Sequence, residues 1–290
     1  MEAFLQQVLT GLSTGGIYAS VALAVVMIYK ATHHVNFAQG EMAMFSTYIA
    51  WQLIAWGMPY WGAFFLTIAI SFVGGVAIER IVIRPFERRD AVLAVVTVFI
   101  GILLILNSLA GWIWEYTIKV FPSPFPAGAV FGGLVSGHQL GLLGVTLAML
   151  LLVYVFFRYT PLGLAMRAAA ENPESSRLVG IRVSRMLALG WGLAGAIGAV
   201  AGMMVAPIVF LEPNMMLSIL IYGFAGALLG GIDNPWGAVI GGFAVGVLEN
   251  VMGVYVVGTE LKLTVALAVI VGVLLIKPSG LFGRTLVTRV

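Results

Sequence analysis

Two carboxylates that could do chemistry lie inside long apolar stretches of this sequence. Glu41 closes the segment VNFAQGE, which also contains Asn36, and Glu249 stands next to Asn250 in a later apolar run. An ionisable side chain in an apolar segment is costly to bury, so each is a candidate functional group. A helix capped by Asn36 would point its positive end at an anionic group such as a carboxylate, whereas Glu249 could meet an ammonium group. The candidate residues for binding a polar solute are Asn36, Phe37, Gln39, Gly40, Glu41, Glu249 and Asn250. Both carboxylates could instead form structural hydrogen bonds between helices.

Catalytic and metal-binding chemistry has little support in the sequence. No nucleophile and base stand at a usable spacing, which argues against an intramembrane enzyme. The chain has no cysteine, which excludes disulfides and thiolate metal sites. It also has no G-x-x-x-x-G-K-[ST] segment and therefore no P-loop for ATP phosphates. The sequence predicts no catalytic residue, no metal site and no cofactor bound by this chain.

The elements that would position these residues are membrane-spanning helices. Of the 290 residues, 61% are hydrophobic and 9% are charged, and the mean hydropathy is +1.06. Because about 20 apolar residues cross a bilayer, we predict an all-α polytopic membrane protein with about eight transmembrane helices, within a range of seven to nine. The predicted spans are 8–29, 37–57, 61–83, 91–114, 140–157, 186–207, 216–232, 236–257 and 261–277.

The second of these spans differs from the others. Glu41 interrupts it, and only 14 uncharged residues (42–55) precede the turn at Trp56-Gly57-Met58-Pro59. A stretch this short is typical of a broken or re-entrant segment. In the last third, runs such as GLAGAIGAVAG and GAVIGGFAVG predict that helix backbones approach closely.

The distribution of basic residues predicts which side of the membrane each loop occupies. With nine crossings and the N-terminus outside, 13 of the 15 Lys and Arg residues fall on the cytoplasmic side. This bias places the polar segment 158–185 and the C-terminus in the cytoplasm. The basic sequence pI of 9.3 therefore reflects membrane-flanking loops and does not indicate nucleic-acid binding.

The polar segment 158–185 has the start and stop signals of a short helix. Asn172 is a good N-cap, Pro173 suits the first helical position, and Glu174 adds negative charge to the first turn. Gly180 is a natural left-handed terminator. The resulting helix of about seven residues is too short to persist alone in water.

The surface of this short helix combines apolar and basic side chains. Leu178, Val179 and Ile181 form an apolar edge, and Arg167 is one of several nearby cations. This mixture suits docking into a groove on a soluble partner. The alternative is an ordinary loop that follows the positive-inside rule.

Several stretches together resemble the LivH-type permease subunit of bacterial branched-chain amino-acid ABC importers. They are GLSTGGIYASVALAVVMIYKATHHVNFAQGEM, IERIVIRPFERR, GLAMRAAAENPESSRLVGIRVSR, LLGGIDNPWGAVIGG and LLIKPSGLFGR. The resemblance covers nearly the whole chain. Two departures lie near the expected pathway: the family signature commonly has His where Gln39 stands, and GGIDNPWGA places Asp-Asn-Pro where a more neutral turn is usual.

The resemblance implies a single transmembrane permease domain over 1–290, with a cytoplasmic coupling loop at about 158–185. In that family the short helix docks into a cleft of a separate ATPase. The implied docking positions are Arg167, Asn172, Pro173, Glu174, Leu178, Gly180 and Ile181. They would transmit nucleotide-driven closure to the pore and would not be catalysts.

The resemblance also implies partners and a location. The chain would import branched-chain, hydrophobic amino acids by alternating access in the bacterial inner membrane, with no enzymatic activity of its own. Its expected partners are a second permease subunit, two P-loop ATPase subunits that use ATP and Mg, and a periplasmic or extracytoplasmic binding protein.

Two alternatives stay open at the level of sequence. A member of the same family could carry urea, amides or another small solute. A passive aquaporin-like channel is the other alternative, since NFA and NPW superficially resemble the paired N-P-A motifs. Neither is N-P-A, no arginine follows the second one, and a channel needs no docking helix.

Overall fold

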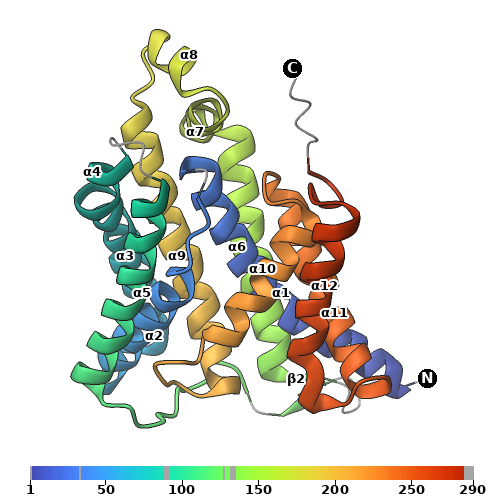
Figure 1. Ribbon diagram of the computed structural model, residues 1–290. Coiled ribbons are helices and arrows are strands. Elements are labelled where there is room, and N and C mark those ends of the chain that lie inside the picture. Colours follow the sequence, from blue (N-terminus) through green and yellow to red (C-terminus); the bar gives the residue numbers. More distant parts are fainter. Residues whose placement is uncertain (1, 33, 88–91, 127, 131–134, 284–290) are drawn as a thin grey trace. The chain divides into compact units, whose positions relative to one another are not determined.

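Helices make up nearly all of the protein in the computed structural model (Figure 1), which describes residues 2–32, 34–87, 92–126, 128–130 and 135–283. Within these residues, seven helices are long and apolar enough to cross a membrane, and Leu217–Gly230 is a shorter apolar helix. This confirms the prediction of an all-α polytopic membrane protein. The predicted spans correspond to observed helices, with ends that shift by a few residues.

The chain folds into two compact units. Unit 1 comprises Met1–Val26, Phe125–Leu143 and Ser218–Val290, and unit 2 comprises Met27–Pro124 and Gly144–Leu217. Helices α1 (Glu2–Thr32) and α6 (Gly137–Tyr159) are divided between the two units, and the first residue of α10 (Leu217–Gly230) belongs to unit 2 while the rest of α10 belongs to unit 1.

Unit 1 is built around the N-terminal helix and the last third of the chain. Besides parts of α1 and α6, it contains α10 (Leu217–Gly230), α11 (Pro235–Tyr255), the 3-10 helix η3 (Thr259–Leu261), α12 (Lys262–Ile276) and the antiparallel pair β1 (Ala129–Val130) and β2 (Val135–Ser136). Small residues bring its backbones together, as predicted. A Cβ atom added to Gly226 of α10 would lie 2.6 Å from the Cα of Gly242 on α11. These two helices can therefore pack this closely only without side chains at the contact.

Unit 2 carries the segments with most of the predicted site residues. It contains α2 (Gln39–Ala55), α3 (Tyr60–Ala77), the π-helix η1 (Ile78–Ile83), α4 (Arg84–Glu87), α5 (Val92–Trp114), α7 (Pro161–Glu171), α8 (Pro173–Leu178) and α9 (Val183–Val209). Helix α9 packs against α2 and α3. A Cβ atom on Gly195 would lie 2.6 Å from the carbonyl oxygen of Ser71 on α3, and one on Gly202 would lie 2.8 Å from that of Ala43 on α2.

Two segments of unit 2 differ from the sequence prediction. Glu41 does not interrupt the second apolar segment: α2 begins at Gln39 and contains Glu41 in its first turn, and the non-helical break lies at residues 34–38. The connection between the predicted spans 61–83 and 91–114 is helical as far as Glu87. It is helical because the third span continues through η1 and α4, where Arg84 is held by hydrogen bonds to Glu79.

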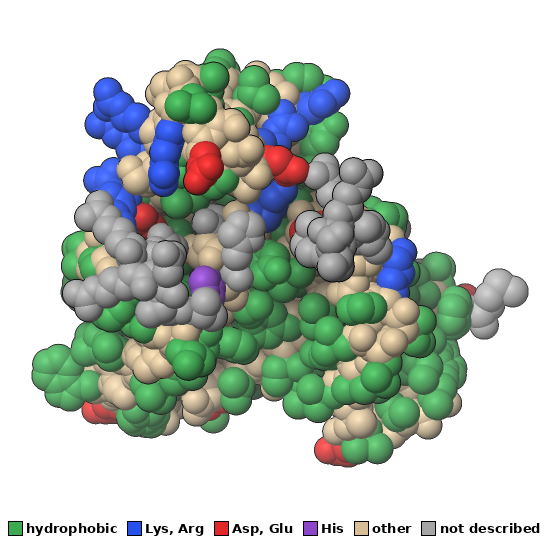
Figure 2. All heavy atoms as spheres, turned by 45° about the horizontal axis from the view of Figure 1, so that its top comes forward, with side chains coloured by type: hydrophobic (Ala, Val, Ile, Leu, Met, Phe, Trp, Pro, Cys, Tyr) green, Lys and Arg blue, Asp and Glu red, His purple; other side chains and the backbone are tan. Residues whose placement is uncertain are grey.

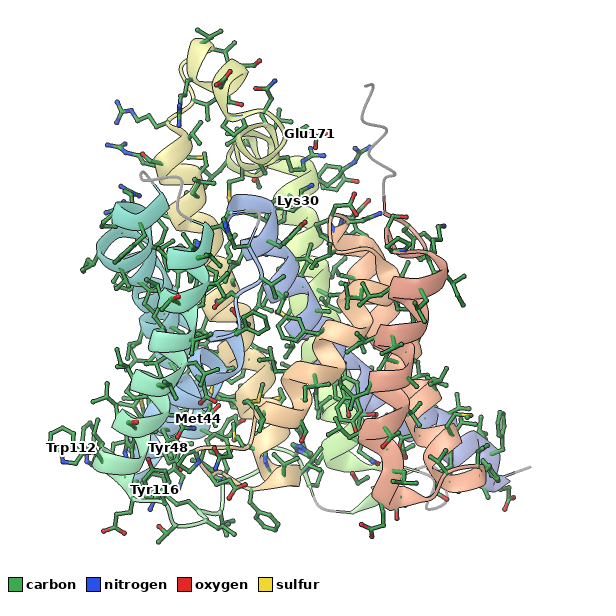
Figure 3. All side chains as sticks on the ribbon, viewed as in Figure 1. Lys30, Met44, Tyr48, Trp112, Tyr116 and Glu171 are labelled. Atoms are coloured by element: carbon green, nitrogen blue, oxygen red, sulfur yellow. The ribbon has the colours of Figure 1, made fainter. Side chains whose placement is uncertain are left out.

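The two ends of unit 2 differ in residue type. Figure 3 shows Trp112 and Tyr116 at one end and Lys30 and Glu171 at the other. Trp112 is 81% exposed and Tyr116 is 63% exposed. Exposed aromatic residues at a helix end are typical of the membrane–water interface, and basic residues collect on the cytoplasmic side.

The α3–α9 contact yields a stability prediction. In Gly75→Ala the new methyl would collide with the carbonyl oxygen of Trp191, whereas adjacent Gly74 has open space around it. We expect Gly75→Ala to destabilise the protein by about 1–3 kcal/mol, which lowers its melting temperature in detergent by roughly 3 °C or more. The matched control Gly74→Ala should leave the melting temperature unchanged or raise it, because Ala favours helix more than Gly. Equal melting temperatures for the two variants would contradict the close contact.

Candidate functional site

Helix α8 has the predicted start and stop signals. The Asn172 side chain accepts a hydrogen bond from the backbone N–H of Ser175 at 3.0 Å, and Pro173 occupies the first turn. Gly180 has a φ of +86°, and its N–H donates to the carbonyl of Arg177 at 3.1 Å. The N–H of Ile181 donates to the carbonyl of Ser176 at 3.0 Å, which completes a Schellman motif. The predicted cap and terminator are confirmed, and the helix has 6 residues.

Helices α7 and α8 form the tip of unit 2 (Figure 1). Ser176 is the one buried residue of α8, while Leu178 is 88% exposed and Val179 is 75% exposed. Figure 2, in which this end comes forward, shows Lys and Arg side chains gathered on the same face. Apolar side chains this exposed beside cations form a surface suited to a protein partner.

The predicted coupling residues all lie in this one continuous stretch. Arg167 is exposed on α7; Asn172, Pro173, Glu174, Leu178 and Gly180 are exposed on or beside α8; Ile181 is half-buried. Their contacts are local, because capping and chain reversal connect residues within about six positions. The arrangement can bind a partner but has no group placed for covalent chemistry.

A second group of predicted residues lies where α2 meets α5 and α9. Gln39 is 1% exposed, and its Nε2 donates to the carbonyl of Ala194 at 3.0 Å, while its Oε1 is buried without a hydrogen-bond partner among the described residues. Glu41 is 5% exposed, and its Oε2 lies 3.5 Å from Nδ2 of Asn107. In the described part of the chain, Glu41 forms no ion pair. This group therefore offers unmatched acceptors.

Asn107 connects Glu41 to the loop after α9. Its Nδ2 donates to the carbonyl of Pro213 at 3.0 Å and lies 3.2 Å from Oδ1 of Asn214. One amide nitrogen with two hydrogens thus faces three oxygen acceptors. Such an acceptor-rich cluster suits a cationic or ammonium group.

Asn36 does not have the predicted capping role. The N-cap position of α2 is Ala38, which has no side-chain cap, and Asn36 instead accepts the Ala38 N–H at 2.9 Å. Asn36 is fully buried, Gly40 is buried, and Phe37 is 40% exposed. The corresponding residue of the later motif does cap its helix: Asn234 accepts the N–H groups of Trp236 and Gly237, each at 3.2 Å. Of the two motifs compared with the paired N-P-A motifs of a channel, NFA and NPW, only NPW therefore has an Asn that caps a helix.

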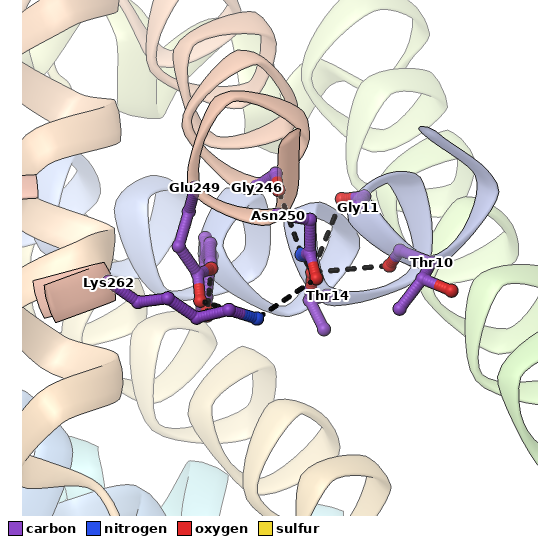
Figure 4. A network of polar contacts seen from close by, with 8 residues as sticks. Thr10, Gly11, Thr14, Gly246, Glu249, Asn250 and Lys262 are labelled. Atoms are coloured by element: carbon purple, nitrogen blue, oxygen red, sulfur yellow. Dashed lines mark hydrogen bonds and ion pairs between the residues drawn. The ribbon is translucent and has the colours of Figure 1, made fainter. Parts of the chain in front are cut away.

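Glu249 and Asn250 belong to a polar network within unit 1 (Figure 4). The Tyr18 hydroxyl donates to Glu249 at 2.8 Å, and Nζ of Lys262 lies 3.7 Å from the same carboxylate. Nδ2 of Asn250 donates to Thr14 at 3.0 Å, and Lys262 donates to Oδ1 of Asn250 at 3.2 Å. The network ties α1, α11 and α12 together and leaves Glu249 compensated by a cation.

The predicted pathway residues are divided between the two units. Asn36, Phe37, Gln39, Gly40 and Glu41 lie in unit 2, and Glu249 and Asn250 lie in unit 1. The described residues contain no group of three His, Cys, Asp or Glu side chains that could hold a metal ion.

Sequence reasoning missed several members of these networks. Lys262 stands at the start of the predicted span 261–277 and was not paired with any acidic residue, although it reaches the Glu249 carboxylate from the start of α12. Tyr18 gave no signal beyond a tyrosine within an apolar span. Glu79 and Arg84 are five residues apart, a spacing that faces across a π-helix and not across an α-helix, where partners stand three or four apart.

Comparison with known proteins adds a further observation. A sequence model of the family described as the permease component of the branched-chain amino acid transport system matches residues 7–274. The high-affinity branched-chain amino acid transport system permease protein LivH of Escherichia coli K12 is 31% identical over 304 aligned residues, which cover 99% of this chain and 98% of that protein. The corresponding protein BraD of Pseudomonas aeruginosa is 30% identical, with the same coverage of both chains. A probable LivH of Methanocaldococcus jannaschii is 30% identical over 91% of this chain and 87% of its own length.

Proposed function

The chain belongs to the family of permease components of branched-chain amino-acid transport systems, and we propose that it forms part of the membrane path of an ATP-driven importer of branched-chain amino acids. It is a multi-pass membrane protein and a transport permease subunit. The observation that carries the proposal is the capped, exposed helix α8 on a chain that matches the family almost end to end.

The role proposed for α8 is docking onto an ATPase subunit. Its caps hold it in shape without packing, and its exposed Leu178 and Val179 provide the apolar contact area. Surrounding arginines would match acidic groups on the partner. A short helix held rigid before binding loses little conformational entropy on docking.

The remaining components follow from this role. ATP and Mg would be used by two P-loop ATPase subunits, because this chain has no P-loop of its own. A second permease subunit and an extracytoplasmic binding protein would complete the importer. The complex would lie in the bacterial inner membrane with the α8 end and the C-terminus in the cytoplasm, in keeping with the basic residues at that end. This chain would bind no cofactor and catalyse no reaction.

Within the proposed path, Glu41 is a better candidate for meeting the ammonium group of an amino acid than Glu249. Glu249 already accepts from Tyr18 and lies beside the Lys262 ammonium. Glu41 has one long contact to an amide, and the cluster around Asn107 has more acceptors than donors. A substrate ammonium with three N–H donors would satisfy this excess.

The proposal is tested by purifying the chain gently from its native membrane and identifying the proteins that accompany it. We expect a P-loop ATPase and a second, similar permease, and ATP-dependent uptake of leucine when the complex is reconstituted with its binding protein. A homo-oligomer without any ATPase would contradict the proposal and favour a channel.

Removing the Asn172 cap of α8 together with the Glu174 charge should weaken coupling about ten-fold without unfolding the protein. Asn172→Ala combined with Glu174→Ala removes a cap worth about 1 kcal/mol and a charge–dipole contact worth about 0.5 kcal/mol, enough to lower the helix population roughly ten-fold. We expect uptake to fall by about that factor while the melting temperature stays within about 2 °C, because α8 is exposed. Ser175→Ala is the control, since the Asn172 cap uses only its backbone N–H. Normal uptake in the double variant would contradict docking through α8.

The two buried carboxylates should respond differently to the same change. Glu41→Gln removes a charged hydrogen-bond acceptor worth about 1.5–3 kcal/mol to an ammonium group, so uptake should fall roughly ten-fold or more at unchanged melting temperature. Glu249→Gln should instead lower the melting temperature and leave uptake per folded complex within about two-fold, because its network joins helices. Both are measured as uptake per purified complex. Unchanged uptake in Glu41→Gln would assign Glu41 a structural role.

A further inference from the structure

Glu79 and Arg84 of unit 2 form an ion pair with two hydrogen bonds. Arg84 donates from Nε to one oxygen of Glu79 at 3.0 Å and from Nη2 to the other at 2.7 Å. Glu79 is 1% exposed, and this guanidinium is its cationic partner. Losing one partner of such a buried pair is strongly unfavourable, which keeps the two side chains in one geometry.

The π-helix is what makes this geometry possible. In the π-helix η1 (Ile78–Ile83) residues five apart lie on the same face, and Glu79 and Arg84 have this spacing. The third span therefore ends in a π-helical turn that is held by the Glu79–Arg84 ion pair. Single π-helical turns are frequent at functional positions.

Arg84 makes one more hydrogen bond, and it leads to the candidate docking segment. Its Nη2 donates to the carbonyl of Ser184 at 2.9 Å. Ser184 lies in the first turn of α9, immediately after α8 and the Gly180 reversal. One guanidinium thus joins η1 and α4, which continue α3, to the junction between α8 and α9.

Helix α8 contacts the rest of unit 2 at few points, so a displacement of α8 can reach the other helices through few connections. Only Ser176 of α8 is buried, so α8 connects to the rest of unit 2 through α7 before it and through the start of α9 after it. The Arg84 contact lies on the second route. Helix α9 then packs along α2 and α3 through its glycines, next to Gln39 and the Glu41 group.

We propose that Glu79 and Arg84 form a latch that fixes the α8–α9 junction to the end of α3, so that displacement of α8 moves α9 and α3 as one body. Both are positioning residues: neither contacts substrate or ATP in this role. The inference rests on the proposed function, because α8 is displaced by a docked ATPase. Without the latch, α8 would pivot at Gly180 and ATP hydrolysis would proceed without transport.

The test compares Arg84→Lys with wild type in the purified, reconstituted complex. Lysine keeps a cation beside Glu79, so the buried carboxylate stays compensated, but a single ammonium on a flexible stem does not reproduce the planar fork to Glu79 and the bond to Ser184 together. We expect leucine transported per ATP hydrolysed to fall at least about five-fold while the ATPase rate stays within about two-fold. Matched controls are Arg80→Lys, which changes an exposed arginine of the same π-helix, and Ser184→Ala, which keeps the carbonyl.

The outcomes separate the latch from a purely structural ion pair. If transport and ATPase activity fall in parallel, or if the Arg84→Lys complex does not assemble, the pair only supports folding and the proposal is overturned. An unchanged ratio of transport to hydrolysis overturns it as well.

A second measurement does not depend on the proposed function. Hydrogen–deuterium exchange of the chain in detergent should be faster over residues 173–187 in Arg84→Lys than in wild type, with unchanged exchange in α10 and α11. Equal exchange over 173–187 would show that Arg84 does not hold the junction, whatever the chain transports. A third outcome separates the two proposals. If exchange over 173–187 is faster in Arg84→Lys than in wild type but the wild-type complex transports no amino acid, the transport proposal is contradicted while the role of Arg84 at the junction is supported.

Discussion

The close approach of α9 to α2 and α3 is the contact on which the rest of unit 2 depends. Lipid tails are as apolar as leucine, so helices in a bilayer gain from meeting each other mainly through close packing and hydrogen bonds. Gly195 and Gly202 allow the backbone of α9 to lie directly against backbone carbonyls of its neighbours. That approach brings the Ala194 carbonyl within 3.0 Å of Gln39 and the Ser184 carbonyl within 2.9 Å of Arg84. These two polar contacts of α9 therefore accompany its close glycine packing.

Three buried carboxylates then differ in how their charge is compensated. Glu79 receives a two-point contact from Arg84, and Glu249 receives a tyrosine hydroxyl and a lysine. Glu41 has an amide at 3.5 Å. A buried charge is tolerated when it is paired and hydrogen-bonded. Glu79 and Glu249 therefore have their cationic and hydrogen-bonding partners within the protein. Glu41 is the carboxylate with capacity left for an outside group.

Helix α8 obtains its order in a different way from the membrane helices. It buries only Ser176, and its shape comes from the Asn172 cap and the reversal at Gly180. Local hydrogen bonds therefore stabilise the helical conformation of α8, whereas packing against neighbouring helices stabilises α9. This leaves the apolar side chains of α8 exposed and keeps them in a defined arrangement, which is the property that a docking element requires.

The sequence by itself determined those features that depend on length, composition or near neighbours. Hydrophobic length predicted the spans, because a bilayer needs a set number of apolar residues. The cap at Asn172 and the terminator at Gly180 were also predictable, because each uses partners within about six residues. The predicted close packing of small-residue runs is likewise seen at Gly202.

Only the tertiary structure decided the partners of the buried polar groups. Asn107 meets Glu41 across 66 positions of the chain, and Tyr18 meets Glu249 across 231. Asn36 does not cap α2, because α2 begins at Gln39 and its N-cap position is Ala38. Arg84 reaches Glu79 because the third span changes to a π-helix. Such contacts depend on helix register and on which faces meet. Apolar sequences specify these weakly, since most faces of an apolar helix can equally face lipid.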